Sequence, residues 1–359
     1  MTHLDRADFL THLTSELVAS GTPREFNNID RARFDHSYSA KTVFKEKVLG
    51  LAASLGFYRA AVISHGQLRD ILKTDGLDEV YGLFQDQLSR DLFVRLLAYR
   101  ILGHRHVRLP LNNEKYWQVR RSVDKYAEKR ATVTGVPILG SLDLFNFNGI
   151  RLHAHALNIL NTFLLEQYRS ARGGIGVRQD DVVIDAGGCW GDTALYFART
   201  ASEVFCFECI PSNIKIIDEN LGMNPVLCAR IKVIHKALWN RSQENLAFKD
   251  TGPGSRPGSD GAGVGVETET LDHFVSANAL GRVDFIKMDI EGSEPEALVG
   301  AEQTIRKHRP QLAISIYHDL RHFASIPRWI ADLGLGYRLY LEHFTIHAEE
   351  TILFARSDL

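Results

Sequence analysis

Residues 181–198 read DVVIDAGGCWGDTALYFA, and this stretch decides the fold of the chain. A short apolar run leads to Asp185, a glycine-rich turn follows, and a second apolar run begins after Asp192. A buried strand, a glycine turn and a helix in this order are typical of nucleoside-binding α/β sheets. The turn glycines lack a Cβ, so the backbone can bend sharply and approach a ligand closely. These glycines are Gly187, Gly188 and Gly191.

The alternation of short apolar runs with helical runs continues to the end of the chain. Apolar strands separated by helices predict a parallel sheet that is covered on both faces. The closing segments GYRLYLEHF and ETILFAR predict an antiparallel hairpin at one edge, so we expect a doubly wound, mostly parallel α/β fold. The predicted strands are 181–186, 204–208, 231–235, 283–291 and 311–318, and the predicted helices are 192–201, 212–221, 294–308 and one that Pro327 opens.

Upstream of residue 175 the pattern is mainly helical. Ser89 is a suitable cap for an amphipathic run. The pair Asn148-Gly149 separates two alternating runs, which predicts a β-hairpin. The predicted helices are 9–19, 42–55, 90–102 and 156–168, and the predicted hairpin strands are 141–147 and 150–155. We therefore divide the chain into a mainly helical region over 1–130, a connecting hairpin and helix over 131–175 and a cofactor-binding domain over 176–359.

Composition excludes several classes of protein. Of the 359 residues, 45% are hydrophobic, and 42 basic against 44 acidic residues leave a formal charge of −2. Without a basic excess, a nucleic-acid-binding surface is not expected. The first thirty residues lack the apolar core of a signal peptide, and the longest apolar run, Val48 to Phe57, is shorter than the ~20 residues of a membrane span. We expect a cytoplasmic chain with reduced thiols and a small-molecule partner.

A second acid lies where a ribose would bind. Glu208 ends the second predicted strand, 23 residues after Asp185, and a carboxylate there can accept hydrogen bonds from both ribose hydroxyls. The turn reads Asp-x-Gly-x-x-x-Gly rather than Gly-x-Gly-x-x-Gly, which disfavours a dinucleotide. S-adenosylmethionine has an ammonium and a carboxylate in place of a pyrophosphate, so Asp185 is expected to hold the ammonium, with Asp289 as a second candidate. The alternative for Asp185 is a helix-capping residue.

The predicted strand 283–291 carries three charges. Period-two alternation places Lys287, Asp289 and Glu291 on one face, and Gly292 ends the strand. Buried charges need partners or a function. The alternative to a functional role is an ion pair of Lys287 with Asp289 or Glu291.

Several segments together resemble the FkbM family of methyltransferases. They are VVIDAGGCWGDTALYFA, FECIPSN, TLDHF, VDFIKMDIEGSEPEALVGAE and ISIYH, in this order, and LSRDLFVRLLAYRILG resembles a helical segment of bacterial members that carry an extra N-terminal region. The resemblance implies a class I, Rossmann-like methyltransferase fold with S-adenosylmethionine as cofactor. It also implies methyl transfer to a hydroxyl of a sugar, polysaccharide unit or secondary metabolite.

The same resemblance assigns site residues. The family's cofactor turn corresponds to Asp185, Gly187, Gly188 and Gly191, its ribose acid to Glu208, and its fourth-strand acids to Asp289 and Glu291. Ala237 follows the third strand, where an adenine ring lies in this fold. The glycine-rich segment 251–264 departs from the tighter connection expected there, and it is either a lid or a plain surface insertion.

Methyl transfer to a hydroxyl requires removal of a proton, so a group with a pKa near neutrality suits this step. His318 ends the strand 311–318 and is the first candidate for the general base. Asp289 or Glu291 could act instead, or hold the cofactor's ammonium, or bind a divalent cation that lowers the acceptor's pKa. Two acids alone do not assemble a divalent-cation site, so we assign no metal.

Two further pairs have weaker signals. His153 and His155 have a spacing seen at metal sites, but without a third ligand in view a structural or pocket-lining role is favoured. Cys206 and Cys209 lack the second pair of a zinc site, so they are interpreted as buried thiols.

Four other side chains could face the substrate. Trp190 and Tyr168 could line the pocket, with ordinary core packing as the alternative. Arg95 and Arg100 could contact an anionic acceptor, with solvated surface positions as the alternative. The N-terminal helices could roof the acceptor site or support a homodimer.

Three other functions stay open. An N-methyltransferase would use the same cofactor site on an amine or amide. A nicotinamide-dependent oxidoreductase would need the Gly-x-Gly-x-x-Gly turn that is absent here. A nucleoside-binding scaffold without chemistry would have no need for Asp289 and Glu291.

Overall fold

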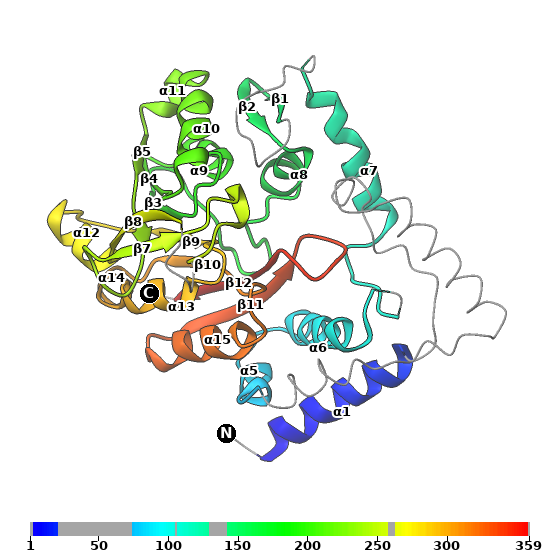
Figure 1. Cartoon of the computed structure of the whole chain (residues 1–359). Helices are drawn as coiled ribbons and strands as arrows, with labels where there is room; N and C mark the ends of the chain where they lie inside the picture. The colour runs from blue at the N-terminus through cyan, green and yellow to red at the C-terminus, as the bar shows by residue number, and fades with distance from the viewer. Residues whose placement is uncertain (1–2, 21–73, 105, 129–141, 258–262, 358–359) are drawn as a thin grey trace.

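The fold is described by a computed structural model that covers residues 3–20, 74–104, 106–128, 142–257 and 263–357. The predicted helix 42–55 lies outside these residues. The main sheet has seven strands in the order β11-β12-β10-β9-β3-β4-β5, and Figure 1 shows it at the centre of the molecule. Its strands are β3 (Val182–Ala186), β4 (Glu203–Phe207), β5 (Ile231–Ile234), β9 (Phe285–Met288), β10 (Gln311–Ser315), β11 (Tyr337–His343) and β12 (Thr351–Ser357).

The central strands are apolar on both faces because helices cover both. Val183 and Phe285 face one core cluster, which includes side chains of α9 (Asp192–Ala198) and α10 (Pro211–Gly222). Ile184 and Ile286 face the opposite cluster, to which the N-terminal helices and four helices of the C-terminal half contribute. The latter four are α12 (Leu271–Ala277), α13 (Glu294–Val299), α14 (Glu302–His308) and α15 (His322–Asp332).

All pairings from β5 to β10 are parallel, whereas β12 pairs antiparallel with both β10 and β11. The predicted doubly wound sheet with an antiparallel edge hairpin is therefore confirmed. A second, three-stranded sheet, which the sequence did not indicate, follows β5. It consists of β6 (Ala237–Leu238), β7 (Asn245–Phe248) and β8 (Val264–Glu269), in the order β6-β8-β7.

The N-terminal helices pack at the β11 edge of the sheet, and Figure 1 shows α1, α5 and α6 gathered there. Phe84 forms a parallel bridge with Leu339, and the Gln85 backbone N donates to the Leu339 oxygen at 3.0 Å. The edge strand is thus covered by this region rather than open. The helices at this edge are α1 (His3–Ser20), α5 (Leu77–Leu83) and α6 (Gln87–Leu102). The next helix, α7 (Glu114–Ser122), leads into the 3₁₀ turn Val123–Tyr126 and contacts the stretch Ile159–Leu164 instead.

The predicted helices 9–19 and 90–102 are confirmed as parts of α1 and α6, but the cap of α6 differs from the prediction. Asp86 is the N-cap, and its carboxylate accepts from the Ser89 backbone N at 2.7 Å. Ser89 lies in the first turn, where its hydroxyl accepts from Leu341 N at 2.9 Å. Its side chain therefore binds the edge strand instead of its own helix.

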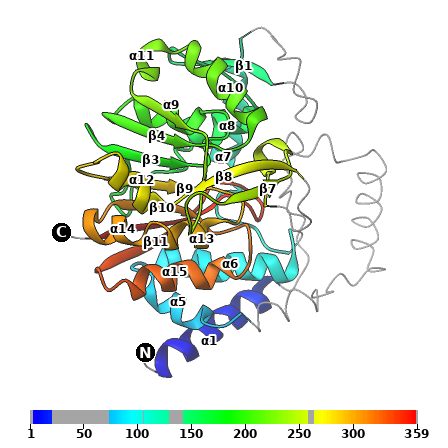
Figure 2. The same cartoon turned by 60° about the vertical axis from the view of Figure 1, so that its left-hand side comes forward.

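The predicted hairpin is confirmed as β1 (Asp143–Phe147) and β2 (Ile150–Ala154), with Phe147 opposite Ile150 and a two-residue turn of positive φ at Asn148 and Gly149. Its sheet packs beside α10, as Figure 2 shows. The predicted helix 156–168 is shorter and wider than expected. A single α-turn (α8, Ala156–Asn158) leads into a π-helical stretch, Ile159–Leu164, and Glu166 ends it with a φ of 50°.

Two predicted helices have different boundaries. The predicted helix 294–308 is two helices, because the backbone at Gly300 packs against the Trp239 carbonyl and Asp272 caps the new start at Gln303 and Thr304. Pro327 does not open its helix but lies inside α15, which begins at His322. The remaining short elements are α11 (Pro225–Cys228) and the 3₁₀ turn Gly252–Gly254. No helix among the described residues has the length and apolar character to span a bilayer.

Candidate active site

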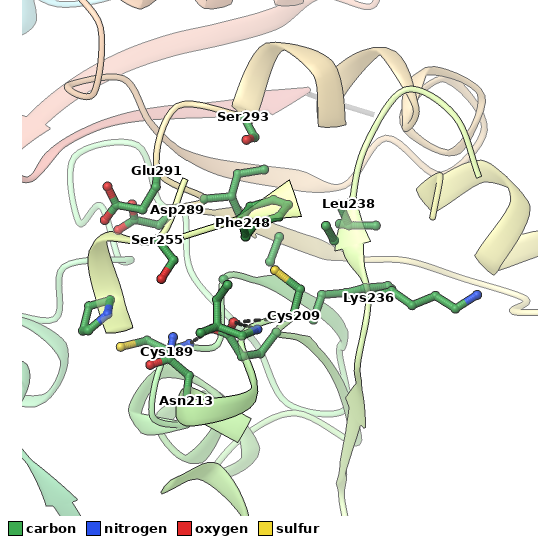
Figure 3. Close-up of a pocket in the computed structure, with 18 of the residues that line it drawn as sticks. Cys189, Cys209, Asn213, Lys236, Leu238, Phe248, Ser255, Asp289, Glu291 and Ser293 are labelled. Atoms are coloured by element: carbon green, nitrogen blue, oxygen red, sulfur yellow. Dashed lines mark hydrogen bonds between the residues drawn. The ribbon is translucent and has the colours of Figure 1, made fainter. Parts of the chain in front are cut away.

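A pocket opens where the carboxyl ends of β3, β4 and β9 meet, the usual ligand position in an open α/β sheet. Figure 3 shows Asp289 and Glu291 on one side of this pocket and Lys236 and Leu238 on the other. Of the predicted site residues, the structure places five in the lining: Gly187, Glu208, Ala237, Asp289 and Glu291. Gly188, Gly191, Asp185 and His318 lie outside it.

The glycine turn is held close to the two neighbouring strands. The backbone N–H groups of Gly187 and Gly188 both donate to the Phe207 oxygen, at 2.9 and 3.0 Å. Gly187 has a φ of 82°, and a β-carbon there would collide with the Asp289 carbonyl oxygen. A side chain at either position would therefore separate β3 from the strands beside it.

Glu208 is buried at the end of β4 with its carboxylate fixed by three backbone donors. They are Cys189 N at 2.8 Å, Cys209 N at 2.7 Å and Ile210 N at 2.8 Å. Burial raises the pKa of Glu208, and these donors oppose that rise. The result is an immobile acceptor that faces the pocket.

Asp185 takes a different position from the expected one. It is fully buried beneath the turn, where Thr193 Oγ1 donates to it at 2.7 Å and Lys287 Nζ lies 3.1 Å from its other oxygen. Lys287 also donates to the carbonyl oxygens of Ala186 and Gly187, at 3.0 and 2.6 Å. The expected partner of Lys287 was Asp289 or Glu291, but in the structure it is Asp185. This pair supports the glycine turn from below.

Other residues of the lining were not singled out from the sequence. Asn213 on α10 is 2% exposed, and its Oδ1 has no hydrogen-bond partner. It lies in the FECIPSN segment, five positions after Glu208, so the spacing was a usable signal. The apolar members Ile210, Leu238 and Phe248 come from a loop and the small sheet, which local periodicity does not reveal.

Asp289 is held in place by aromatic hydroxyls. The Tyr168 hydroxyl donates to its Oδ2 at 2.7 Å, and the Tyr317 hydroxyl lies 3.4 Å from Oδ1. Burial and the neighbouring Asp289 raise the pKa of Tyr168 well above its usual value, so the phenol stays a donor. Tyr168 is thus a buried hydrogen-bond donor to Asp289, and it lies just after the π-helical stretch that ends at Leu164.

His318 lies behind the two pocket acids with 2% of its side chain exposed. Its Nδ1 is 3.0 Å from Glu294 Oε1, and Glu294 is fully buried. Burial lowers the pKa of His318, but Glu294 and Asp289 outweigh it and raise the pKa to about 9. Burial raises the pKa of Glu291 to about 7. In this arrangement His318 is already protonated at neutral pH, unlike the neutral base expected from its sequence position.

The glycine-rich segment after β7 contributes to the pocket wall. Gly252, Pro253 and Ser255 belong to the lining, and Arg256 Nη2 lies 3.2 Å from Glu291 Oε2. Its residues 258–262 lie outside the described part of the chain. The described half therefore borders the acid end of the site.

The N-terminal region touches the site from behind. The Arg100 guanidinium lies over the Phe323 ring at 5.0 Å, and its Nη2 donates to the Tyr317 carbonyl oxygen at 2.9 Å. Arg95 pairs instead with Glu16, at 3.2 Å. Neither arginine belongs to the pocket lining, so the structure brings no N-terminal arginine to a substrate.

The weaker candidates from the sequence, namely Trp190, the His153–His155 pair and the Cys206–Cys209 pair, make packing and backbone contacts. Trp190 is 1% exposed and stands edge-on to the His155 ring at 4.9 Å. His153 exchanges backbone hydrogen bonds with Asn220. Cys206 and Cys209 are free thiols, of which Cys206 is buried in the core and Cys209 lines the pocket. None of these residues belongs to a group of metal-ligand geometry within the described residues.

Comparison with known proteins identifies the class. Residues 175–339 match the model of the methyltransferase FkbM domain. The FkbM methyltransferase of Methylobacillus flagellatus KT superposes with a TM-score of 0.54 at 17% identity, over 89% of this chain and 71% of that one. The fold is thus that of a class I methyltransferase.

Residues 175–339 thus carry the similarity to the methyltransferase FkbM domain, a little under half of the chain. A curated relative is the 2-O-methyltransferase NoeI of Sinorhizobium fredii (strain NBRC 101917 / NGR234), 27% identical over 154 residues. That match covers 37% of this chain and 62% of NoeI, so the chain spans less than two thirds of its relative's length.

Proposed function

We propose that this methyltransferase acts on oxygen and that its acceptor is a hydroxyl of a sugar, a polysaccharide unit or a related natural product. The observation that carries the proposal is the pair Asp289 and Glu291 on the pocket wall beyond the glycine turn. Carboxylates suit the removal of a hydroxyl proton during transfer. The similarity to a 2-O-methyltransferase supports transfer to oxygen.

The lining suggests how the donor would be held. Glu208 is fixed for the two ribose hydroxyls, and the unpartnered Asn213 Oδ1 is a buried acceptor beside it. Ala237, Leu238 and Phe248 offer an apolar wall for the adenine. The site residues fit an adenosine, and this arrangement directs its sulfur end toward Asp289.

The bound cofactor supplies a methyl carbon on a sulfonium. The acceptor oxygen would form its bond to that carbon as the carbon–sulfur bond broke with both electrons on sulfur, and the hydroxyl proton would pass to one carboxylate, that of Asp289 or that of Glu291. The chain's contribution is alignment of the acceptor and acceptance of its proton. His318 holds the two acids together from behind rather than meeting the acceptor.

The test separates binding from chemistry. Calorimetric titration with S-adenosylhomocysteine should show binding that Glu208→Gln weakens at least about tenfold, because an amide turns one fixed acceptor into a donor. Turnover with a panel of sugars, followed by S-adenosylhomocysteine release and by NMR of the new methoxy group, should fall about 10²-fold or more in Glu291→Gln. Cofactor affinity should stay unchanged in that variant.

Glu302→Gln is the matched control, because Glu302 forms a solvent-exposed pair with Arg306 on α14. This variant should change neither the affinity for S-adenosylhomocysteine nor the turnover. Binding of NAD in place of S-adenosylhomocysteine would contradict the proposal, and so would a methylated nitrogen in the product.

A further inference from the structure

A third metal-binding side chain faces the two pocket acids. His318 Nε2 lies 3.4 Å from Asp289 Oδ1 and 3.6 Å from Glu291 Oε2. Both separations exceed a good N–H···O hydrogen bond. The ring is 2% exposed, and its Nε2 has no hydrogen-bond partner. The sequence predicted His318, Asp289 and Glu291 as residues of one site, and in the structure the imidazole Nε2 faces both acids.

The far side of the ring is already oriented. His318 Nδ1 lies 3.0 Å from Glu294 Oε1, and Glu294 is itself fixed by the Ile290 backbone N at 2.9 Å. Metal-binding histidines characteristically have a carboxylate beside their second ring nitrogen, and Glu294 occupies this position at ion-pair distance from Nδ1. Tyr168 orients Asp289 in the same manner, at 2.7 Å.

The spacing suits a shared ion. Two donors that are each about 2.1 Å from one cation lie roughly 3.0–3.4 Å apart at tetrahedral or octahedral angles. The atoms facing Nε2 need to move by only a few tenths of an ångström to reach that range. Within the described residues, the group whose ligand atoms all lie within 4.8 Å of one another is Asp289, Glu294 and His318, so Glu291 would have to turn its side chain toward Asp289 to share an ion. Because Glu294 approaches Nδ1, on the opposite side of the ring from Nε2, it serves as the outer carboxylate rather than as a ligand.

We propose that Asp289, Glu291 and His318 bind a divalent cation that accepts mixed nitrogen and oxygen ligands, of the Mn²⁺ type. Binding displaces the Nε2 proton of His318 to solvent, because a histidine ligand must be deprotonated at the coordinating nitrogen. The two acids line the pocket, so the remaining coordination positions face the space where an acceptor would enter. Arg256, which is half-exposed and 3.2 Å from Glu291, would leave this carboxylate when the cation arrives.

The cation's role rests on the proposed function, although its binding does not. A hydroxyl coordinated to the cation has a lowered pKa, so its proton passes more readily to the second oxygen of the Glu291 carboxylate. The oxygen then forms its bond to the methyl carbon as the carbon–sulfur bond breaks toward sulfur. The same three residues would thus hold the cation and place the acceptor.

The experiment is a titration of the full chain with Mn²⁺ after treatment with a chelator, in the presence of S-adenosylhomocysteine. The loss of the free Mn²⁺ signal in electron paramagnetic resonance counts the bound ions. One ion per chain is expected, with at least a tenfold weaker affinity in Asp289→Asn and in His318→Ala. Glu291→Gln, at a partly exposed position, tests the same ligand set with the smallest risk to folding.

His273→Ala is the matched control, because His273 Nδ1 lies 2.9 Å from Glu269 in a similar pair on α12, away from Asp289 and Glu291. It should bind Mn²⁺ like the unchanged chain. Circular dichroism and S-adenosylhomocysteine binding on the same samples establish that each variant is folded. Failure to bind Mn²⁺, or equal binding in all three site variants, overturns the cation site.

The two proposals fail in different ways. A chain that binds S-adenosylhomocysteine and methylates a hydroxyl but takes up no Mn²⁺ retains the proposed function without the cation. A chain that binds one Mn²⁺ through these residues but methylates no hydroxyl retains the cation site and loses the proposed function.

Discussion

Lys287 and Asp185 form an ion pair with almost no exposure to solvent, 2% and 0% of their side chains. Burying two charges costs several kcal/mol for each ion unless they are paired and hydrogen-bonded. Lys287 meets this condition through Asp185 and two carbonyl oxygens of the β3 end. Burial lowers the pKa of Lys287, but Asp185 and the other acids raise it further, so the ammonium stays charged.

Substitution of Lys287 by a residue without a charge should lower the stability of the fold. We expect Lys287→Met to lower the free energy of unfolding by about 3–5 kcal/mol, because Asp185 is left buried without its counter-ion. Urea denaturation measures the loss. The double variant Lys287→Met with Asp185→Leu should recover part of it, since no charge then remains buried. A single variant as stable as the unchanged chain would contradict this account.

This pair also marks the limit of prediction for individual residues. Glu208 and Gly187 could be placed at the pocket because residues at the carboxyl ends of parallel strands share one edge of the sheet. The pairing of Asp185 with Lys287 depends on β3 lying directly beside β9 with these two residues in register, although 102 positions separate them. Alternation along one strand does not reveal which neighbour faces it.

At the level of elements, two asparagines of the α10 region attach the β1–β2 hairpin. Asn220 accepts from His153 N at 2.6 Å and donates to His153 O at 3.0 Å. Asn224 makes the same exchange with Arg151, at 3.0 and 2.6 Å. The two amides therefore satisfy the edge of β2 as a neighbouring strand would.

We expect Asn220→Ala to lower the free energy of unfolding by about 1–3 kcal/mol, because buried backbone groups of His153 lose their partners. Asn245→Ala is the control, since Asn245 is an exposed residue at the start of β7. It should change stability little. Equal denaturation midpoints for the two variants would show that the asparagine contacts contribute no stability.

Elements with a strong local signal were predictable. Asn148-Gly149 favours a two-residue turn because both positions tolerate positive φ, and that turn is present. The break at Gly300 was not predictable, since it depends on a close approach to Trp239 on the small sheet. The π-helical stretch likewise depends on its contacts, including a hydrogen bond from Thr162 to Asp192 at 2.6 Å.

For the whole molecule, the N-terminal helices close the β11 edge, and Phe84 is the residue at the junction. Its side chain is 1% exposed and touches the Phe93 ring, 5.3 Å between centroids. We expect Phe84→Ala to cost about 3–5 kcal/mol of stability by leaving a cavity. Hydrogen exchange should quicken in β11 more than in β3, because only β11 loses its cover.

Leu88→Ala is the control for that exchange experiment, because Leu88 is 61% exposed on the same helix pair. Its exchange profile should match that of the unchanged chain. Faster exchange spread evenly over the sheet in Phe84→Ala would mean that the helices stabilise the whole fold rather than its edge. The sequence predicted these helices but not their position, because docking between distant segments leaves no local pattern.

The hydrogen bond from Arg100 to the Tyr317 carbonyl has a consequence for engineering. It joins α6 to the residue that precedes His318, so a hybrid made by exchanging the helical region for that of a relative would bring a foreign helix face against this strand end. A hybrid that lacks Arg100 would lose its contact with the Phe323 ring and its hydrogen bond to the Tyr317 carbonyl, next to the strand end that carries His318. The crossover point in such hybrids is therefore best chosen upstream of α6, with α6 and β10 taken from the same parent.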